Sequence, residues 1–231
     1  MKTIGLVGGM SWESSVIYYR LINEAVRARL GGLHSAKCLM YSVDFAEIEP
    51  LQHAGRWDEA AQRLMAAARH VQDGGADFLL LCTNTMHKIA DQLQAGLRIP
   101  VLHIADATAE AVQARGLQKL GLLGTKFTME EEFYRSRLGR KYALEAIVPP
   151  AEARETVHRI IFQELCLGRM EPHSKAELIR IMNALARRGA EGIILGCTEI
   201  GLLVSDGECS VPLFDTTRIH AEAAVEEALR E

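Results

Sequence analysis

Short apolar runs bounded by glycine alternate with longer amphipathic stretches along this chain. Four runs, at residues 3–7, 78–81, 119–123 and 192–195, are almost entirely apolar. Such runs are typical of buried parallel strands. Residues 57–72 and 175–188 instead repeat apolar side chains at helical spacing, and a glycine follows each stretch. That pattern predicts two amphipathic helices that end near their glycines.

The second half of the chain repeats the first. Ile4-Gly-Leu-Val-Gly recurs 116 residues later as Leu120-Gly-Leu-Leu-Gly. The pair Cys82-Thr recurs at Cys197-Thr, at an offset of 115, and each pair follows a Gly-Ala-acidic residue and an apolar run. Since only two copies exist, we interpret the repeat as two similar units facing each other rather than a solenoid. The predicted fold is α/β, with two pseudo-twofold related lobes, each a parallel sheet flanked by helices, and an active site in the cleft between them.

Two of the five cysteines stand where ligands bind in parallel sheets. Cys82 and Cys197 each follow a predicted buried strand and precede a predicted helix. Ligands bind outside the carboxyl ends of such strands, and a helix N-terminus there favours a thiolate. The remaining three cysteines lack this setting and are expected to be buried thiols; they are Cys38, Cys166 and Cys209.

Two opposed thiols suit proton exchange at a stereocentre. One thiol removes a proton from one face, and the other delivers a proton to the opposite face. Each thiol must act as acid or base, and a pKa lowered from about 8.5 towards neutrality allows that. Acyl transfer would need a histidine beside each cysteine, and a redox pair would need a CxxC spacing; neither is repeated here. The two cysteines therefore predict two-base racemisation.

Composition narrows the class of protein. The 231 residues are 48% hydrophobic and 24% charged, with a net charge of −4 and no basic cluster. This excludes a disordered chain and gives no sign of nucleic-acid binding. No run of 18 apolar residues and no signal sequence is present, so we expect a cytoplasmic protein with no membrane partner. The histidines and cysteines show no metal-ligand spacing, and the first glycines do not form GxGxxG, so neither a metal nor a dinucleotide is expected.

Four motifs resemble the aspartate/glutamate racemase family. They are Gly-Gly-Met-Ser near the start, Leu-Cys82-Thr-Asn-Thr-Met-His, Leu-Leu-Gly-Thr125 and Gly-Cys197-Thr-Glu-Ile-Gly. The likeness covers the whole chain and is greatest to the bacterial L-aspartate/glutamate-specific and broad-specificity amino-acid racemases. It implies a racemase that uses no pyridoxal phosphate or other cofactor, with an amino acid as substrate and Cys82 and Cys197 as its acid/base thiols.

The resemblance also implies roles for the polar residues around the two thiols. Glu199 would support the second thiol or the substrate ammonium, and Met10 would offer a backbone contact. The substrate's carboxylate and ammonium would be held by Thr83, Asn84, Thr85, Thr125 and Thr198. Thr83 and Thr198 could equally cap the following helices, and the two roles can coexist.

One departure concerns the substrate side chain. Dicarboxylate-specific relatives carry a lysine two residues before a glycine in a helical segment, where this chain has Cys166. Gln52 is a candidate polar contact for the substrate side chain, although glutamine more often lies on the protein surface. A strict specificity for aspartate is therefore not expected.

The resemblance further predicts the division of the chain. Residues 1–104 with 209–231 would form the first lobe, on which a C-terminal helix at 217–229 packs, and residues 105–208 would form the second. We expect a homodimer. Three other functions remain open: a cis–trans isomerase or decarboxylase of small carboxylates, an amino-acid-binding module without turnover, and a thiol redox enzyme.

Overall fold

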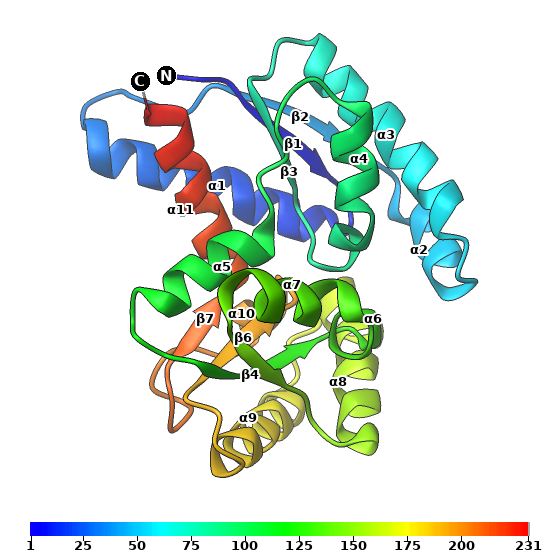
Figure 1. Ribbon diagram of the computed structural model, residues 1–231, viewed down its shortest axis with the longest axis vertical. Helices are drawn as coiled ribbons and strands as arrows, with labels where there is room; N and C mark the ends of the chain where they lie inside the picture. The colour runs from blue at the N-terminus through cyan, green and yellow to red at the C-terminus, as the bar shows by residue number, and fades with distance from the viewer. Residues whose placement is uncertain (231) are drawn as a thin grey trace. The chain divides into compact units, whose positions relative to one another are not determined.

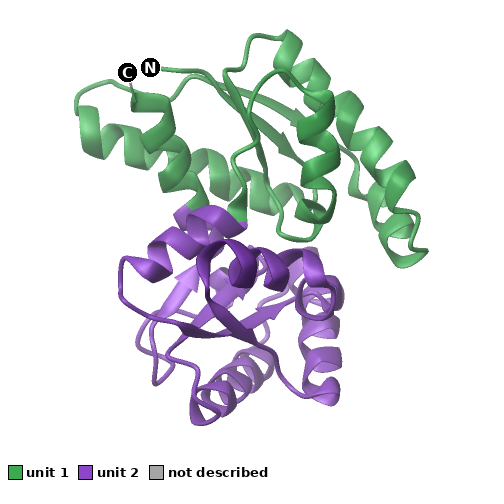
Figure 2. Cartoon of the chain, viewed as in Figure 1, with its two compact units in different colours: residues 1–104, 220–231 green, residues 105–219 purple. Residues whose placement is uncertain are grey.

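The computed structural model describes residues 1–230, which form two compact units (Figure 2). Unit 1 comprises residues 1–104 and the segment from residue 220 onward, and unit 2 comprises residues 105–219. The chain passes from unit 1 to unit 2 within helix α5 (Ile104–Gln113) and returns within helix α11 (Thr216–Leu229). Residues 209–219 thus lie in unit 2 rather than in the first lobe as predicted, because the strand that they contain pairs with the sheet of unit 2.

Unit 1 is built on a three-stranded parallel sheet in the order β2-β1-β3. Its strands are β1 (Ile4–Gly8), β2 (Cys38–Ser42) and β3 (Phe78–Leu81). The side chains of β1 and β3 are fully buried, as expected for near-continuous apolar strands with helices on both faces. Ile4 lies opposite Phe78 and Val7 opposite Leu81, so β1 and β3 end at the same edge of the sheet.

Helices cover both faces of this sheet (Figure 1). α1 (Trp12–Leu30) and α11 pack together with one face. The other face is covered by α2 (Phe45–His53), α3 (Trp57–Asp73), the 3₁₀ helix η1 (Thr85–Ile89) and α4 (Ala90–Gly96). The predicted packing of the C-terminal helix on the first unit is confirmed, since α11 contributes Ala221, Ala224 and Val225 to the cluster beneath α1.

Unit 2 holds a four-stranded parallel sheet in the order β5-β4-β6-β7. The strands are β4 (Lys119–Gly124), β5 (Glu145–Ile147), β6 (Gly192–Gly196) and β7 (Leu213–Asp215). Besides α5, its helices are α6 (Lys126–Glu130), α7 (Glu132–Tyr142), α8 (Ala151–Gln163), η2 (Leu165–Leu167), α9 (Pro172–Arg187) and α10 (Ile200–Leu203). The buried residues of α8 and α9 pack with Ile193 and Leu195 of β6 in one core cluster.

The predicted α/β fold with two parallel sheets is confirmed. All four predicted strands are present, and both amphipathic helices occur within a few residues of their predicted limits, as α3 and α9.

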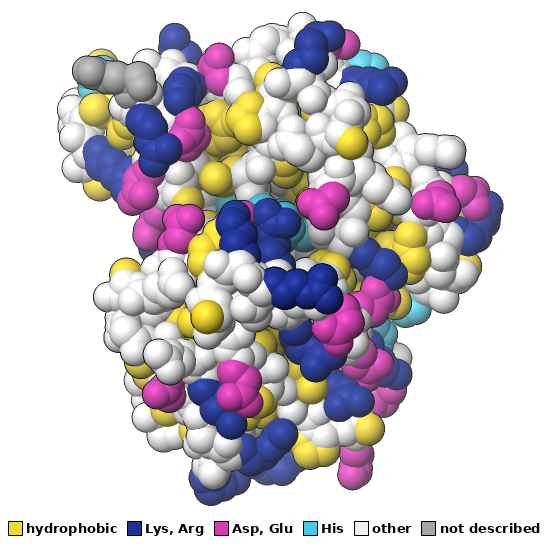
Figure 3. All heavy atoms as spheres, viewed as in Figure 1, with side chains coloured by type: hydrophobic (Ala, Val, Ile, Leu, Met, Phe, Trp, Pro, Cys, Tyr) yellow, Lys and Arg dark blue, Asp and Glu magenta, His cyan; other side chains and the backbone are white. Residues whose placement is uncertain are grey.

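On the face shown in Figure 3, basic and acidic side chains are interspersed over both units. No helix within residues 1–230 is long and apolar enough to cross a membrane.

Candidate functional site

Two loops of unit 1 leave neighbouring strands at the carboxyl edge of the sheet. β1 continues into Gly9–Ser11, and β3 continues into Cys82–Thr85. The Cys82 N–H donates to the Val7 carbonyl at 2.9 Å, which extends the pairing of the two strands to their ends. Because the strands are adjacent and parallel, the two loops begin side by side. This edge is where parallel sheets bind ligands.

The loop after β1 is fixed by serines of α1. The Ser15 hydroxyl accepts from the Gly9 N–H at 2.8 Å and donates to the Ser11 carbonyl at 3.2 Å. Ser11 caps α1 by accepting from the Ser14 N–H at 3.4 Å. Met10, between them, is buried, and its peptide bond to Ser11 is cis. Ser15 was not among the predicted site residues, because its role follows only from the fold of the loop.

Cys82 is enclosed by apolar side chains. It continues the alternation of β3, so its side chain joins Phe78 and Leu80 on the face covered by α1 and α11, with no exposed surface. Burial, and to a lesser degree the Cys38 thiol, raises the pKa of Cys82 well above its usual range. The expected shift towards neutrality is therefore wrong for this thiol.

The residues after Cys82 are polar and buried. Thr83, Asn84 and Thr85 are all less than 9% exposed. The alternative role of Thr83 as a helix cap is not found, because η1 begins at Thr85 with Asn84 at the cap position and no side-chain cap bond. The Thr83 carbonyl accepts a hydrogen bond from His87 Nδ1 at 2.7 Å.

Gln52 lies on α2 and is buried rather than on the surface, with 2% of its area exposed. Its Nε2 donates to the Met86 sulfur at 3.0 Å, and Oε1 has no hydrogen-bond partner. An amide with an unsatisfied oxygen has capacity to bind a polar group. The role of Gln52 as a contact for the substrate side chain stays a prediction.

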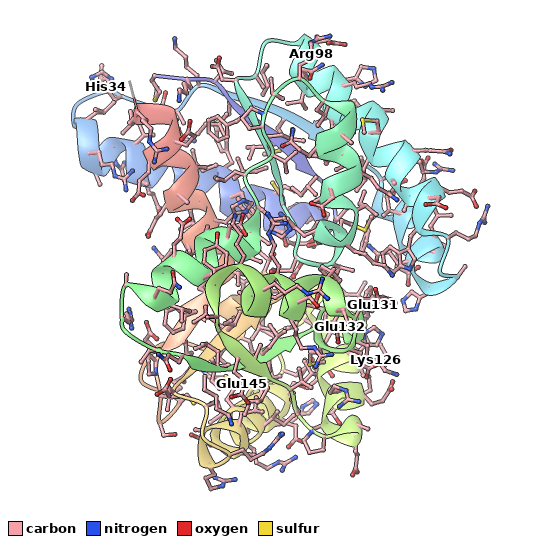
Figure 4. All side chains as sticks on the ribbon, in the orientation of Figure 1. His34, Arg98, Lys126, Glu131, Glu132 and Glu145 are labelled. Atoms are coloured by element: carbon pink, nitrogen blue, oxygen red, sulfur yellow. The ribbon has the colours of Figure 1, made fainter. Side chains whose placement is uncertain are left out.

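Unit 2 places a second pair of loops at the carboxyl edge of its own sheet. β4 leads to Thr125, and β6 leads to Cys197, with Gly124 opposite Gly196. Thr125 caps α6 by accepting from the Thr128 N–H at 3.3 Å, and the two threonine hydroxyls lie 3.2 Å apart. Lys126, labelled in Figure 4, follows the cap and pairs with Glu155 of α8.

The Cys197 thiol donates to the Glu199 carboxylate, with 3.0 Å between Sγ and Oε2. Burial raises the pKa of Cys197 well above its usual range, and the charge of Glu199 adds to the rise. The predicted lowering of the pKa by a helix N-terminus is therefore not found here either. α10 after this site has only four residues, and Thr198 does not cap it, because Glu199 occupies the cap position without a side-chain cap bond.

The strand registers show which residues of the two units correspond, and the result differs from the match of Cys82-Thr to Cys197-Thr in the sequence. Ile4 of β1 pairs with Phe78, and its repeat Leu120 pairs with Gly192. The Leu79 N–H donates to the Pro100 carbonyl, and the Ile193 N–H donates to that of Pro212. Both comparisons relate β3 to β6 by 114 residues, not 115.

With this offset, the predicted equivalence of Cys82 and Cys197 is wrong. Cys82 corresponds to Gly196, and Thr83 corresponds to Cys197. The faces of the sheets agree: Cys197 lies with Ile193 and Leu195, whose counterparts Leu79 and Leu81 lie on the face opposite to Cys82. The two Cys-Thr pairs are thus similar in sequence but displaced by one position in the fold.

Within residues 1–230, no group of three or more histidine, cysteine, aspartate or glutamate side chains could hold a metal ion. The features at the two sheet edges are hydroxyls, amides, thiols and one carboxylate. These groups can bind a small polar molecule and transfer protons.

Comparison with known proteins identifies the family. The sequence model described as Asp/Glu/Hydantoin racemase matches residues 7–224, which is nearly the whole chain. The chain belongs to this racemase family. Racemases are isomerases, so the family also gives the class of enzyme. The curated broad specificity amino-acid racemase RacX of Bacillus subtilis (strain 168) is 22% identical over 227 residues, which cover 96% of each chain.

Solved structures of the family share the fold along the full length. A candidate Asp/Glu racemase from Yersinia pestis is 54% identical, with a TM-score of 0.92 and complete coverage of both chains. An aspartate racemase homologue from Pyrococcus horikoshii OT3 is 36% identical, with a TM-score of 0.86 and again complete coverage of both. The predicted resemblance to aspartate/glutamate racemases is therefore confirmed.

Proposed function

We propose that this protein racemises amino acids by two-base proton transfer at Cα, with Cys197 as one acid/base group. The observation that carries the proposal is the Cys197–Glu199 pair, a buried thiol whose proton already points at a carboxylate 3.0 Å away. Glu199 can accept that proton and leave a thiolate. The thiolate then takes the α-proton of the substrate, and a group of unit 1 donates a proton to the opposite face of the carbanion.

Hydroxyl and amide groups supply the stabilisation that this step needs. When the α-proton leaves, negative charge spreads onto the substrate carboxylate. Thr125 and Thr198 in unit 2, and Thr83, Asn84 and Thr85 in unit 1, are all buried at the carboxyl edges of their sheets. Buried donors stabilise such charge more than donors in water do, because the local dielectric constant is low. The proposed step consumes no oxidant and needs no cofactor.

Two residues are candidates for the acid/base group of unit 1. The sequence motif predicts Cys82, the only thiol in the loop after β3. The strand registers favour Thr83, which corresponds to Cys197, whereas Cys82 lies in the apolar cluster on the other face of the sheet. A hydroxyl is a much poorer base than a thiol, so a Cys197–Thr83 pair would be asymmetric, with the α-proton removed faster on the side of Cys197.

We further propose a broad range of substrate side chains. Cys166 is a half-buried residue of η2, and the family resemblance places it where dicarboxylate-specific relatives have a lysine. A thiol cannot form an ion pair with a second carboxylate as an ammonium can. RacX of Bacillus subtilis carries broad specificity in its name, which agrees with this proposal. Gln52 would then contact polar side chains through its unpartnered Oε1.

Variants of the two candidates decide between them. Cys82→Ala, Thr83→Val and Cys197→Ser are compared with the parent by racemisation of each common amino acid and by deuterium uptake at Cα. If Thr83 is the second group, Thr83→Val abolishes inversion while Cys82→Ala retains most of it; the reverse result assigns Cys82. Cys197→Ser is expected to lose inversion in either case, and a rate near that of the parent would refute the proposal.

The same assay separates the remaining alternatives. A decarboxylase would release carbon dioxide and lose the substrate carboxylate, and a cis–trans isomerase would act on unsaturated acids without exchange at a saturated Cα. A binding module would show affinity for amino acids but no exchange. The homodimer and the cytoplasmic location remain predictions, which sedimentation of the purified protein and fractionation of cells would test.

A further inference from the structure

Three buried histidines form a group next to the loop that follows β3, and His87 contacts that loop. His87, His103 and His220 are each no more than 6% exposed. The ring centroids of His87 and His103 are 4.6 Å apart, and those of His87 and His220 are 5.7 Å apart. All three belong to unit 1, and the two-base mechanism assigns no role to any of them.

His87 connects two backbone segments through the two sides of its ring. Nδ1 lies 2.7 Å from the Thr83 carbonyl, and Nε2 lies 3.1 Å from the Ile104 N–H. A carbonyl can only accept, so Nδ1 carries a proton; an N–H can only donate, so Nε2 carries a lone pair. The two contacts together require a neutral ring with its proton on Nδ1. A protonated ring would place two donors against each other at Ile104.

The Thr83 carbonyl lies outside the backbone hydrogen bonding of any helix or strand. Cys82, Thr83 and Asn84 lie between β3 and η1, outside any helix or strand. A buried carbonyl that no helix or strand pairs needs another donor, from a side chain or from water. The imidazole of His87, four residues further along the same segment, supplies this bond. It thereby fixes the peptide between Thr83 and Asn84 relative to the first residue of α5.

The rest of the group holds the ring in place. His220 lies on α11, where its Nε2 donates to the Leu102 carbonyl at 2.9 Å and its Nδ1 lies 2.8 Å from the Tyr18 hydroxyl. Burial lowers the pKa of His220, which favours the neutral ring with its proton on Nε2. The titratable groups that these contacts place around His87 are His103, His220 and Tyr18, none of which brings a carboxylate. A ring whose two nitrogens are both bonded to backbone groups suits a rigid support better than a proton carrier.

We propose that His87 is a positioning residue, which acts through the Thr83 carbonyl to hold the loop Cys82–Thr85 in the geometry needed for proton transfer. This inference rests on the proposed racemase function. It predicts that a loss of His87 slows the half-reaction served by unit 1 and spares the half-reaction served by Cys197. A misplacement of a reacting group by about 1 Å can cost about 100-fold in rate, so the expected decrease in kcat is about 10- to 100-fold, with a smaller change in KM.

The test compares three variants by deuterium uptake at Cα from each enantiomer separately. His87→Leu removes both hydrogen bonds, and His87→Asn keeps an amide N–H near the position of Nδ1. Tyr18→Phe is the matched control, because it removes a hydrogen bond from the same buried group without a direct bond to Thr83. We expect His87→Leu to change the ratio of the two uptake rates at least 10-fold, His87→Asn to restore part of it, and Tyr18→Phe to leave it unchanged. An equal decrease for both enantiomers in His87→Leu would overturn the proposal.

A spectroscopic measurement on the substrate-free parent keeps the inference separate from the racemase assay. Nitrogen-15 spectra of labelled histidine should show His87 as the neutral Nδ1–H tautomer at neutral pH, assigned by its loss in His87→Asn. A ring that is protonated, or that carries its proton on Nε2, would overturn the role of His87 whatever the enzyme's activity. If the tautomer is as expected but the parent exchanges no amino acid, the proposed function fails instead.

Discussion

Gly9 shows how one residue type is required by the loop that follows β1. Its φ is +92°, a conformation that side chains with a Cβ rarely adopt, and a Cβ there would lie 2.1 Å from the Val43 carbonyl oxygen. Both the backbone conformation and the contact exclude other residues. The neighbouring Met10 and Ser11 are therefore held in position by a glycine that contributes no chemistry of its own.

Gly9→Ala should thus be strongly destabilising, by about 2 kcal/mol or more, because the new Cβ collides with backbone that cannot move freely. Gly55→Ala is the matched control: its φ is +68°, but nothing lies within 4 Å of the added Cβ. The control should lose only about 1–2 kcal/mol, which is the cost of the conformation alone. Urea denaturation of both variants measures the difference, and equal losses would contradict the role assigned to the Val43 contact.

For the loop after β3, the sequence predicted the position in the fold but not which of its residues corresponds to Cys197. The position of the loop was predictable, because a buried apolar run bounded by glycine and polar residues indicates the end of a parallel strand. The match of Cys82-Thr to Cys197-Thr was misleading, because it aligned identical letters and required a gap of one residue. Only the pairing of β1 with β3 and of β4 with β6 shows that Thr83 and Cys197 correspond. A displacement of one residue in a strand moves a side chain to the other face of the sheet.

The helices differ in how well their sequences revealed them. α3 and α9 have regular apolar stripes and were predicted within a few residues. The predicted helices after Cys82 and Cys197 proved to be short, a 3₁₀ helix with α4 after the first and the four-residue α10 after the second. Their sequences contain the polar residues of the site, so no long apolar stripe exists. The expected lowering of both thiol pKa values was also wrong. Burial raises the pKa of each thiol by more than the N-terminus of such a short helix can lower it.

α5 and α7 are joined by a cluster of charges that the sequence did not reveal. Asp106 of α5 accepts from Arg137 Nε at 2.6 Å and Nη2 at 2.8 Å, and from Lys141 Nζ at 2.7 Å. Burial alone would raise the pKa of Asp106, but these hydrogen bonds outweigh it, so the pKa lies below its usual value. A two-pronged arginine–carboxylate pair is among the stronger polar contacts in proteins.

Asp106→Asn should lower the free energy of unfolding by about 2 kcal/mol at pH 7, because two cations lose their counter-charge. A carboxylate with a lowered pKa contributes stability above its ordinary pKa and loses it as the pH falls through the folded-state value. The difference between parent and variant should therefore be constant from pH 8 to pH 5 and decrease below about 3.8, the ordinary pKa of the group. Lys141→Ala, at a more exposed partner, should cost less than about 1 kcal/mol. Urea denaturation across this pH range provides the measurement, and a difference that grows on acidification would be inconsistent with the cluster.

Across the whole molecule, a single α/β unit occurs twice with different additions. Both sheets are parallel and carry their candidate loops at the carboxyl edge. The isolated pairing of Leu79 with Val101 in unit 1 corresponds to the pairing of Ile193 with Leu213 in unit 2, where it has grown into β7. This duplication made the fold predictable, because each half of the sequence supports the interpretation of the other.

His220 gives the molecule a definite sensitivity to acid. Burial lowers its pKa from 6.5 to about 4, against a smaller opposite effect of the Leu102 carbonyl. Between these values the unfolded chain binds a proton that the folded chain does not, so stability falls as the pH decreases from 6.5 to 4. One group with this shift accounts for up to about 3 kcal/mol.

His220→Gln should flatten that part of the pH dependence, although it also lowers stability at pH 7 by disturbing the bonds to Tyr18 and Leu102. The informative quantity is the slope of unfolding free energy against pH between 4 and 6.5, measured by urea denaturation. His53→Gln, at an exposed histidine of α2, serves as the control and should leave the slope close to that of the parent. A slope unchanged by His220→Gln would show that other groups bind the proton.

Proton exchange at Cα is the direct test of racemisation through Cys197. The parent is incubated in deuterated water with the L and, separately, the D form of each common amino acid, and both configuration and deuterium content are followed. We expect that at least one amino acid is inverted from both directions with one deuterium incorporated at Cα, and that Cys197→Ser abolishes inversion. Inversion without deuterium uptake, or inversion that persists in Cys197→Ser at nearly the parent rate, would contradict two-base proton transfer through Cys197.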